Sequence, residues 1–325
     1  MSSQQQAGRL HGPAFSYPEE GAARSEWILS ARSAVSREVL PASLPAGFLW
    51  EDEWQGGNGL MPGLTVFLAN RECPWRCLMC DLWRQSTGGR ATADDILSQV
   101  DMALASRGGR RIDWIKLYNA GSFFDRGAIP PSAYEGLARR CGIARRAIVE
   151  CHPSLVGPPV AAFRALLPTG TRLEVAMGLE TANPHAHALL NKRTTPEDFA
   201  GAARWLRDRG IGVRLFLLTR PPFLAVAEAR EWLLRSVDYA LELGGDPVVV
   251  IPTRGGNGAM ERLRAAGAWD EAPLEWLEMA VRHGRSRRMG RVMADTWGLR
   301  ERAAAVEGGF ALVDRLEALN RGEEA

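Results

Sequence analysis

Three cysteines lie within eight residues of one another, in the segment Arg71-Glu72-Cys73-Pro74-Trp75-Arg76-Cys77-Leu78-Met79-Cys80-Asp81. Their spacing is C-x3-C-x2-C, and thiolates are the ligands that iron-sulfur clusters take from proteins. Three thiolates hold three irons of a [4Fe-4S] cluster and leave the fourth iron without a protein ligand. A catalytic metal site keeps an open position, whereas a structural site closes its shell. The segment therefore predicts a catalytic [4Fe-4S] cluster on Cys73, Cys77 and Cys80.

Two non-catalytic binding modules are the alternatives. Structural zinc usually takes four ligands from paired C-x2-C or Cys/His units, and this chain has a single C-x2-C. A ferredoxin-type electron carrier would take a fourth nearby cysteine. The remaining cysteines, Cys141 and Cys151, stand alone, and we expect them to pack as small hydrophobic side chains.

The cysteine segment directly follows the first of six predicted strands, which alternate with amphipathic helices. This alternation is typical of βα units and a parallel sheet. The strands are expected at 65–70, 112–118, 147–151, 172–177, 213–219 and 248–251. The helices are expected at 93–105, 132–140, 160–167, 196–208 and 225–243. In a parallel barrel the carboxyl ends of the strands build the active site, so the cysteines stand where a reactive metal belongs.

The predicted fold class is α/β, a partial TIM-like (β/α)6 barrel with an N-terminal extension and a helical C-terminal extension. We expect residues 1–24 to be disordered, 25–63 to form the N-terminal extension, 64–255 the barrel and 256–325 the C-terminal extension. Further helices are expected at 26–40, ended by Pro41, and at 260–266 and 274–284, with a possible seventh strand at 291–294. Turns are expected from Pro45 to Gly59.

The composition is that of an ordinary globular protein, with 46% hydrophobic and 24% charged residues and a net charge of +2. A dedicated nucleic-acid binder is usually more basic, so the charge neither indicates nor excludes RNA. Lys116 and Lys192 are the only lysines in the chain. No apolar run reaches about 18 residues, so no membrane partner is expected. Five cysteines, three of them clustered, do not suit a disulfide framework, which favours a cytoplasmic protein.

The chain resembles the radical S-adenosylmethionine (SAM) superfamily, and within it the archaeosine-biosynthesis radical SAM proteins, which look related to the catalytic subunit of Elongator. The resemblance runs from about Leu64 to about Leu299. It rests on the cysteine segment and on the segments 117–125, 149–153, 178–183, 191–193, 217–224 and 251–253. It implies SAM as a second cofactor, bound at the open iron and cleaved by the reduced cluster to a 5′-deoxyadenosyl radical.

The resemblance also implies roles for residues at the strand ends. The loop residues Asn119, Ala120, Gly121 and Ser122 are expected at the methionine amino group of SAM, although a plain βα turn would also suit them. The carboxylates of Glu150 and Glu180 are expected to bind the ribose or ammonium of SAM; a helix cap or a surface charge is the alternative. Leu217 is expected against the adenine, unless it belongs to an ordinary core strand.

Three residues are candidate substrate contacts: Asp125, His152 and Arg254. His152 stands where the family pattern would place arginine before Pro153, which suggests a changed substrate or an ordinary polar loop. Arg254 belongs to the glycine-rich turn 253–258, which could bind an anion with backbone N–H groups or be a flexible turn. Lys192 and Arg193 are expected at a solvated helix edge, and a clamp for a phosphate or carboxylate is the alternative.

The sequence thus predicts a radical SAM enzyme that modifies a 7-deazaguanine-type nucleobase or a tRNA. In the archaeosine family, the implied reaction cleaves a lysine adduct on a 7-deazaguanine base in tRNA. A radical SAM enzyme for a small metabolite or peptide is the alternative. The expected partners are an electron donor of flavodoxin or ferredoxin type and, since no separate RNA-binding domain is evident, a partner subunit for tRNA. The catalytic residues are left unassigned.

Overall fold

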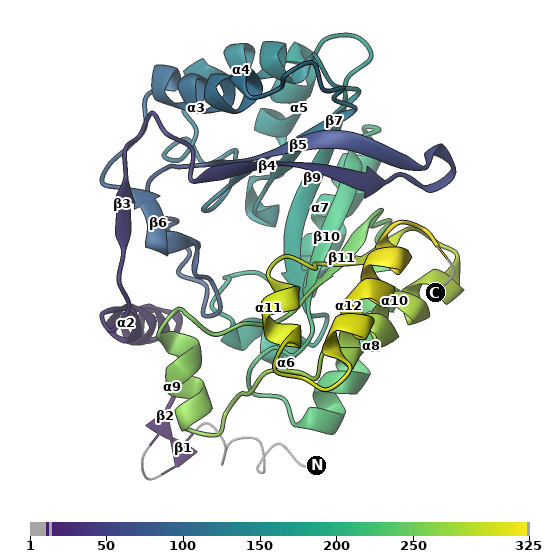
Figure 1. The fold of residues 1–325 in the computed structure, drawn as a ribbon. Helices are drawn as coiled ribbons and strands as arrows, with labels where there is room; N and C mark the ends of the chain where they lie inside the picture. The colour runs from purple at the N-terminus through teal and green to yellow at the C-terminus, as the bar shows by residue number, and fades with distance from the viewer. Residues whose placement is uncertain (1–10, 13–14, 324–325) are drawn as a thin grey trace.

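The computed structural model describes residues 11–12 and 15–323, and its centre is one curled, eight-stranded sheet (Figure 1). The strands are ordered β12-β11-β10-β9-β8-β7-β5-β4. All neighbours are parallel except β4 and β5, which form an antiparallel pair at one edge. The strands are β4 (Gly47–Trp54), β5 (Leu60–Leu68), β7 (Trp114–Asn119), β8 (Arg146–Glu150), β9 (Arg172–Glu180), β10 (Gly212–Leu218), β11 (Val248–Ile251) and β12 (Val292–Ala294). This half-barrel confirms the predicted fold class, and β12 is the expected seventh strand.

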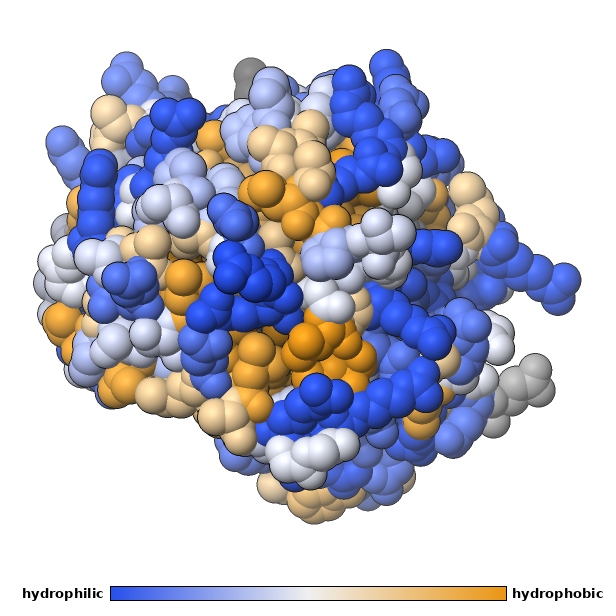
Figure 2. All heavy atoms as spheres, turned by 90° about the horizontal axis from the view of Figure 1, so that it is seen from above, coloured by the Kyte–Doolittle hydropathy of each residue, from blue (hydrophilic) through white to orange (hydrophobic). Residues whose placement is uncertain are grey.

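Helices cover the outer face of the sheet. They are α3 (Ala93–Ala105), α4 (Tyr134–Cys141), α5 (Pro158–Leu166), α7 (Pro196–Arg207), α8 (Val226–Glu242) and α10 (Glu275–Arg287). Capping boxes begin α3 at Thr92 and α7 at Thr195, where an aspartate three residues later bonds back to the cap. In the central parallel strands, alternate residues such as Leu117 and Val149 are fully buried under these helices. Seen from above, hydrophobic side chains gather near the centre of the face and hydrophilic ones surround them (Figure 2).

The concave face of the sheet is filled at its amino-terminal half by buried charges. Arg214 donates to both carboxylate oxygens of Glu53, at 2.9 and 2.7 Å, and to Glu174 at 2.7 Å. Lys116 lies 2.8 Å from the second oxygen of Glu53. All four side chains are buried, which ionic groups tolerate only when they are paired. These residues close the bottom of the half-barrel and leave the carboxyl ends of the strands open.

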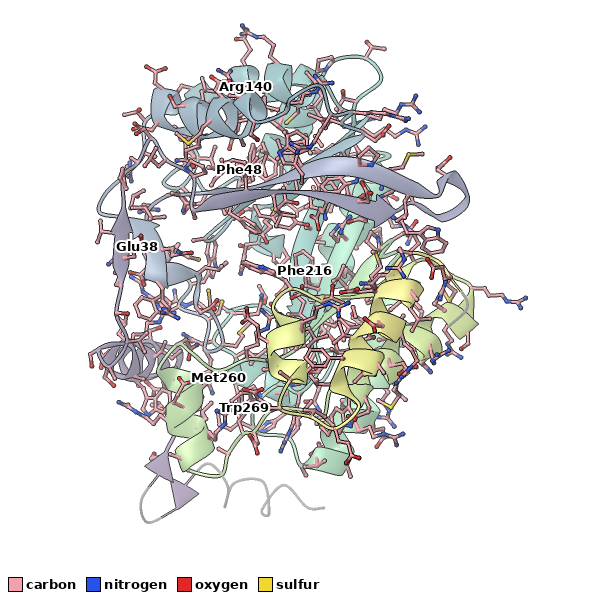
Figure 3. The ribbon with its side chains drawn as sticks, viewed as in Figure 1. Glu38, Phe48, Arg140, Phe216, Met260 and Trp269 are labelled. Carbon is pink, nitrogen blue, oxygen red and sulfur yellow. The ribbon has the colours of Figure 1, made fainter. Side chains whose placement is uncertain are left out.

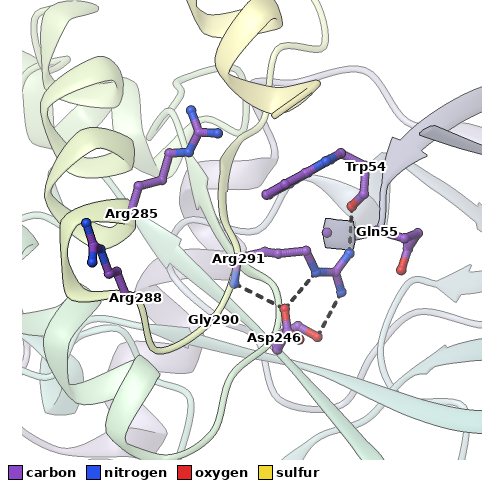
Figure 4. A pocket seen from close by; sticks show the side chains of 8 residues that line it. Trp54, Gln55, Asp246, Arg285, Arg288, Gly290 and Arg291 are labelled. Atoms are coloured by element: carbon purple, nitrogen blue, oxygen red, sulfur yellow. Dashed lines mark hydrogen bonds and ion pairs between the residues drawn. The ribbon is translucent and has the colours of Figure 1, made fainter. Parts of the chain in front are cut away.

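The two outer strands of the sheet are also joined across the open side. Arg291, just before β12, donates to the carbonyl of Trp54 at the end of β4, at 2.7 Å, and to Asp246 at 2.7 Å (Figure 4). The cavity around these groups lies at the amino ends of the parallel strands, opposite the cysteine loop. At the carboxyl ends, the indole of Trp297 stacks on Phe67 of β5. Contacts at both ends therefore bridge the gap that an open half-barrel would leave.

The N-terminal region departs from two expectations. The predicted helix at 26–40 is wrong in its bounds: α2 is Gly21–Arg32, and Glu38–Leu40 is the short strand β3, paired with β6 (Gln85–Thr87). Leu40 precedes Pro41, and a residue before proline disfavours helix. Residues 1–10 and 13–14 lie outside the described residues, but the expected disorder is wrong for Tyr17, whose buried hydroxyl donates to the carbonyl of Leu189.

Strand β4 lies where only turns were expected. Its sequence carries Glu51, Asp52 and Glu53, which read as solvated residues. In the fold Glu53 faces the buried cations, so the strand is stabilised by partners far away in sequence.

The remaining elements are β1 (His11–Gly12), β2 (Phe15–Ser16), α6 (Pro184–Leu189), α9 (Ala259–Ala265), α11 (Leu299–Ala303), α12 (Gly309–Asn320) and the 3-10 turns η1 (Gly56–Asn58), η2 (Leu82–Arg84), η3 (Pro131–Ala133) and η4 (Pro153–Leu155). Within residues 11–12 and 15–323, no helix is long and apolar enough to cross a membrane. The expected domain bounds and cytoplasmic location stay predictions.

Candidate functional site

The cysteine loop connects the carboxyl end of β5 to η2. Cys73, Cys77 and Cys80 are free thiols that line one cavity. Its other walls are Arg32, Glu72, Arg76, Leu82, Trp83 and Ala120. In the part of the chain that the structure describes, no three Cys, His, Asp or Glu side chains are grouped so that they could hold one metal ion. A [4Fe-4S] cluster takes one thiolate on each of three irons, so thiols spread around a cavity fit a cluster better than they fit one zinc ion.

Burial sets the protonation state of the three thiols. It raises the pKa of Cys73 and Cys77 to about 11 and that of Cys80 to about 12. Hydrogen bonds from the backbone of Trp75 and Leu82 act in the opposite direction on Cys73 and Cys80. The thiols are therefore protonated without metal, and they would release protons on binding iron.

Residues distant in sequence hold the cysteine loop. The side-chain amide of Asn257 donates to the carbonyls of Leu78, at 2.8 Å, and Cys80, at 3.2 Å. Asn191 donates to the carbonyl of Arg76 at 3.0 Å. From α2, Arg32 donates to Glu72 at 2.8 Å. The loop is thus fixed from three segments of the chain, none of which the cysteine spacing identifies.

The glycine-rich turn 253–258 binds an anion with its backbone N–H groups, and this anion is the carboxylate of a nearby glutamate, Glu261. The backbone N–H groups of Gly256 and Gly258 donate to the two carboxylate oxygens of Glu261, at 2.5 and 2.7 Å. The expected anion site is therefore already occupied. The turn instead presents Asn257 to the cysteine loop.

The loop after β7 lies beside the first cysteine. An ideal Cβ on Gly121 would be in van der Waals contact with the Cys73 sulfur, at 3.5 Å, and the φ of +135° is one that other residues rarely adopt. The side-chain amide of Asn119 is buried, and neither its oxygen nor its nitrogen has a partner. Unpaired buried polar groups are costly, and a ligand that pairs them removes the cost. An amino acid such as the methionine part of SAM carries groups that fit this amide.

Ser122 has a structural contact, since its hydroxyl accepts a hydrogen bond from the backbone of His152. Glu150 extends toward the same loop from β8. One of its carboxylate oxygens accepts the backbone N–H of Asn119 at 3.0 Å. Burial raises the pKa of Glu150 to about 7, against the effect of this bond. This carboxyl group can therefore gain or lose its charge near neutral pH.

Glu180 and Lys192 form a buried ion pair near the cysteines. The Lys192 ammonium lies 2.8 Å from Glu180, and both side chains are about one-tenth exposed. Burial alone would lower the pKa of Lys192, but Glu180, together with Cys77, raises it. Glu180 has a φ of +66°, and an ideal Cβ on Gly178 would be 2.3 Å from its carboxylate, so glycine makes room for the pair. The expectation of a solvated Lys192 is wrong, because this carboxylate compensates its burial.

Two residues with expected ligand contacts, Leu217 and Asp125, are engaged in contacts within the protein. Leu217 is fully buried between β10 and the helices, whereas its neighbour Phe216 lies on the concave side (Figure 3). Leu217 therefore cannot pack against a ligand in the half-barrel. Asp125 bonds Arg71, at 3.1 Å, and the backbone of Gly127, at 2.9 Å. The first contact reaches the start of the cysteine segment, 54 residues away in sequence, and the second stays inside the loop of Asp125, so Asp125 ties the two loops together.

His152 lies beside the cysteine loop, with its ring stacked on Trp75 at 4.1 Å. Its two ring nitrogens contact the Ser154 hydroxyl and the Lys192 carbonyl, at 2.7 and 3.1 Å. Burial lowers the pKa of His152 to about 4, so the ring is neutral at pH 7. Its contacts join three loops at the site, which is a supporting role.

Arg254 is engaged with the loop after β12. It donates to Asp295 at 3.0 Å and to the carbonyl of Trp297 at 2.7 Å. The structure therefore brings together the cysteines, residues 119–122, Glu150 and Glu180, whereas Arg254 is bonded to the loop after β12. Sequence reasoning missed Asn257, Lys192 and Trp297; for Lys192, the scarcity of lysine was a usable signal.

Comparisons with known proteins agree with this arrangement. Residues 69–223 match the model of the Radical SAM superfamily. Archaeosine synthase subunit beta of Methanosarcina acetivorans is 26% identical over 226 residues, which cover 66% of this chain and 64% of that protein. The protein of the same name from Thermococcus kodakarensis is 29% identical over 173 residues, which cover 50% and 53%. This chain thus matches less than two thirds of either relative.

A solved structure has a similar fold. The crystal structure of Streptococcus suis SuiB bound to S-adenosylmethionine superposes with a TM-score of 0.51 and 14% sequence identity. The match covers 73% of this chain and 52% of that one. At this identity the likeness concerns the fold alone.

Proposed function

Since residues 69–223 form a radical SAM domain, we propose that this enzyme holds its cluster on Cys73, Cys77 and Cys80 and acts on a 7-deazaguanine-type nucleobase in tRNA. Radical SAM enzymes use a [4Fe-4S] cluster and SAM, the two cofactors expected from the sequence. When bound, these cofactors supply a 5′-deoxyadenosyl radical that removes a hydrogen atom from the substrate. The observation that carries the proposal is the cavity lined by three thiols, next to the unpaired amide of Asn119.

The residues around the cavity have distinct proposed roles. Asn119, with the backbone of Ala120 and Gly121, binds the amino and carboxylate groups of SAM. Glu150 accepts from the ribose or the ammonium, and the bond from the Asn119 backbone to one of its oxygens holds it at this loop. Glu180 orients Lys192, whose charge acts on the thiols of Cys77 and Cys80 and would match the negative charge of a loaded site.

The affinity for SAM is expected to rise with pH. The pKa of Glu150 is raised to about 7, so the fraction of charged carboxylate rises about tenfold between pH 6 and pH 8. Binding that needs this charge should strengthen by about the same factor. The measurement is the Kd for SAM of the loaded enzyme, by equilibrium dialysis at several pH values. Glu150→Gln is the control and should flatten the profile; a slope that persists in this variant would exclude the role.

The nucleobase substrate is supported by the two relatives named archaeosine synthase subunit beta. The net charge of +2 suits a chain that does not hold a whole tRNA by itself. We therefore propose that a partner subunit binds the tRNA and that a flavodoxin or ferredoxin reduces the cluster. The same charge is also compatible with the second candidate, a small metabolite or peptide substrate.

The isolated chain is expected to bind tRNA with a Kd in the micromolar range or weaker at about 0.15 M salt, as non-specific phosphate contacts do. Tight binding should require the partner. Titrations of tRNA at several salt concentrations, with and without co-purifying protein, measure this. Deletion of the gene should remove one 7-deazaguanine-type nucleoside from total tRNA. An unchanged nucleoside profile, together with no tRNA binding under either condition, would favour the small-molecule substrate.

A further inference from the structure

The open half of the concave face is lined by aromatic rings. Phe67, Tyr118 and Phe216 come from β5, β7 and β10, and each is partly exposed, although the residues before and after it in its strand are almost fully buried. The ring centroids of Phe67 and Tyr118 are 6.5 Å apart, and those of Tyr118 and Phe216 are 6.0 Å apart. Phe216 lies near the centre of the molecule in Figure 3. The three rings therefore form a continuous wall that faces the opening.

Trp297 completes this wall from the other edge of the sheet. Its indole is stacked on Phe67 at 5.7 Å with 13° between the planes, yet the residue is 67% exposed. A tryptophan is seldom so exposed, because burial of its ring is strongly favourable. One face of the indole is covered by Phe67. The other side is left available to a ligand.

The backbone that carries Trp297 is held in place. Its N–H donates to Asp295 at 3.1 Å, and its carbonyl accepts from Arg254 at 2.7 Å. Arg254 also binds the second oxygen of Asp295. Three residues after Arg254, Asn257 holds the cysteine loop. The exposed indole is thus fixed by a short segment that also supports the proposed cluster site.

We infer that Trp297, with Phe67, forms a stacking platform for the planar heteroaromatic ring of the substrate, and that Arg254 is a positioning residue for this platform. The inference rests on the proposed function and specifies how its substrate is recognised. Stacking suits a ring rather than an aliphatic chain, because an indole face gains most from a second π-system. The ring could belong to a free base or to a base within tRNA, since both present the same face.

The test compares Trp297→Ala and Trp297→Phe with the parent. The probes are 7-deazaguanine, an unmodified tRNA transcript and, as an aliphatic control, free lysine. Trp297→Ala should weaken binding of the ring-bearing probe about 5- to 150-fold, the range for loss of one base stack. Trp297→Phe should restore most of it. Phe310→Ala is the matched control, since Phe310 is another exposed aromatic residue, 54% exposed on α12, and should change nothing.

The outcomes separate the inference from the proposed function. Binding of 7-deazaguanine indicates that the substrate ring is a free base, and binding of the transcript alone indicates a base within tRNA. Either result supports the platform if the Trp297→Ala substitution weakens the binding of that probe. Equal binding by parent and Trp297→Ala, or binding of neither ring probe, overturns the platform. A loss of SAM affinity in Trp297→Ala as large as the loss of ring affinity would assign the stack to the adenine of SAM and also overturn it. Release of 5′-deoxyadenosine by the parent, measured separately, tests the radical SAM function.

Discussion

Alanine at Cys73, Cys77 or Cys80 is expected to abolish the iron-sulfur cluster. After anaerobic reconstitution, the parent should contain about four irons and four sulfides per chain, because three thiolates and SAM complete the ligand set. Each single variant loses one of three anchors in the same cavity. Iron and sulfide assays, with the charge-transfer absorbance of the cluster, measure the result.

Cys141→Ala is the control for this series. Cys141 is fully buried in the main core between α4 and its neighbours, away from the cysteine loop. The Cys141→Ala variant should therefore keep the full iron content of the parent. One zinc per chain without iron-sulfur absorbance in the parent would contradict the cluster and return the chain to a zinc-binding module.

Arg214→Ala is expected to cost about 3–5 kcal/mol of the free energy of unfolding, the usual effect of removing one partner of a buried ion pair. Arg214 is the shared partner of Glu53 and Glu174, and all three side chains are at most 5% exposed. The variant leaves two carboxylates buried without this cation. Urea unfolding monitored by circular dichroism measures the difference. Arg139→Ala removes an exposed pair with Glu135 and should change the free energy by less than about 1 kcal/mol.

The effect of Arg214→Ala should shrink at low pH. Burial would raise the pKa of Glu53, but Arg214 and Lys116 outweigh it and hold the pKa well below its ordinary value of 4.5. A depressed carboxyl pKa contributes stability above pH 4.5, and this contribution is lost as the pH falls through the folded value. In the variant Glu53 keeps Lys116 but loses the Arg214 guanidinium that lowers its pKa, so this carboxylate is protonated more easily. A difference from the parent that stays constant between pH 7 and pH 3.5 would contradict this account of the network.

The periodicity of the sequence predicted the strands within a few residues, because the buried outer face of each strand needs apolar residues in a parallel sheet. Strand β4 escaped prediction, since Glu51 and Glu53 look solvated until Lys116 and Arg214 are placed opposite them. The error at Leu217 has a similar cause. Leu215 and Leu217 are as apolar as Phe216, so hydrophobicity alone does not reveal which of these residues faces the concave side, and the fold selects Phe216.

The cysteine motif was readable because its chemistry is local, whereas its supports are not. Asn257 and Asn191 resemble ordinary turn residues in sequence. The scarcity of lysine in the sequence was informative. In a chain whose other basic residues are arginines, Lys116 and Lys192 are both buried and both paired with carboxylates, where a compact ammonium fits.

The way in which the cysteine loop is held has a consequence for biogenesis. Asn257 reaches back 179 residues to the carbonyl of Leu78, and Arg32 contacts Glu72 from 40 residues upstream. Contacts at such separations form late, because the chain between them must first be ordered. A ribosome-bound chain that has emerged only through the cysteines would lack this support. Iron loading is therefore expected to follow synthesis and folding of the chain at least as far as Asn257, so the assembled cluster marks a chain that has already folded.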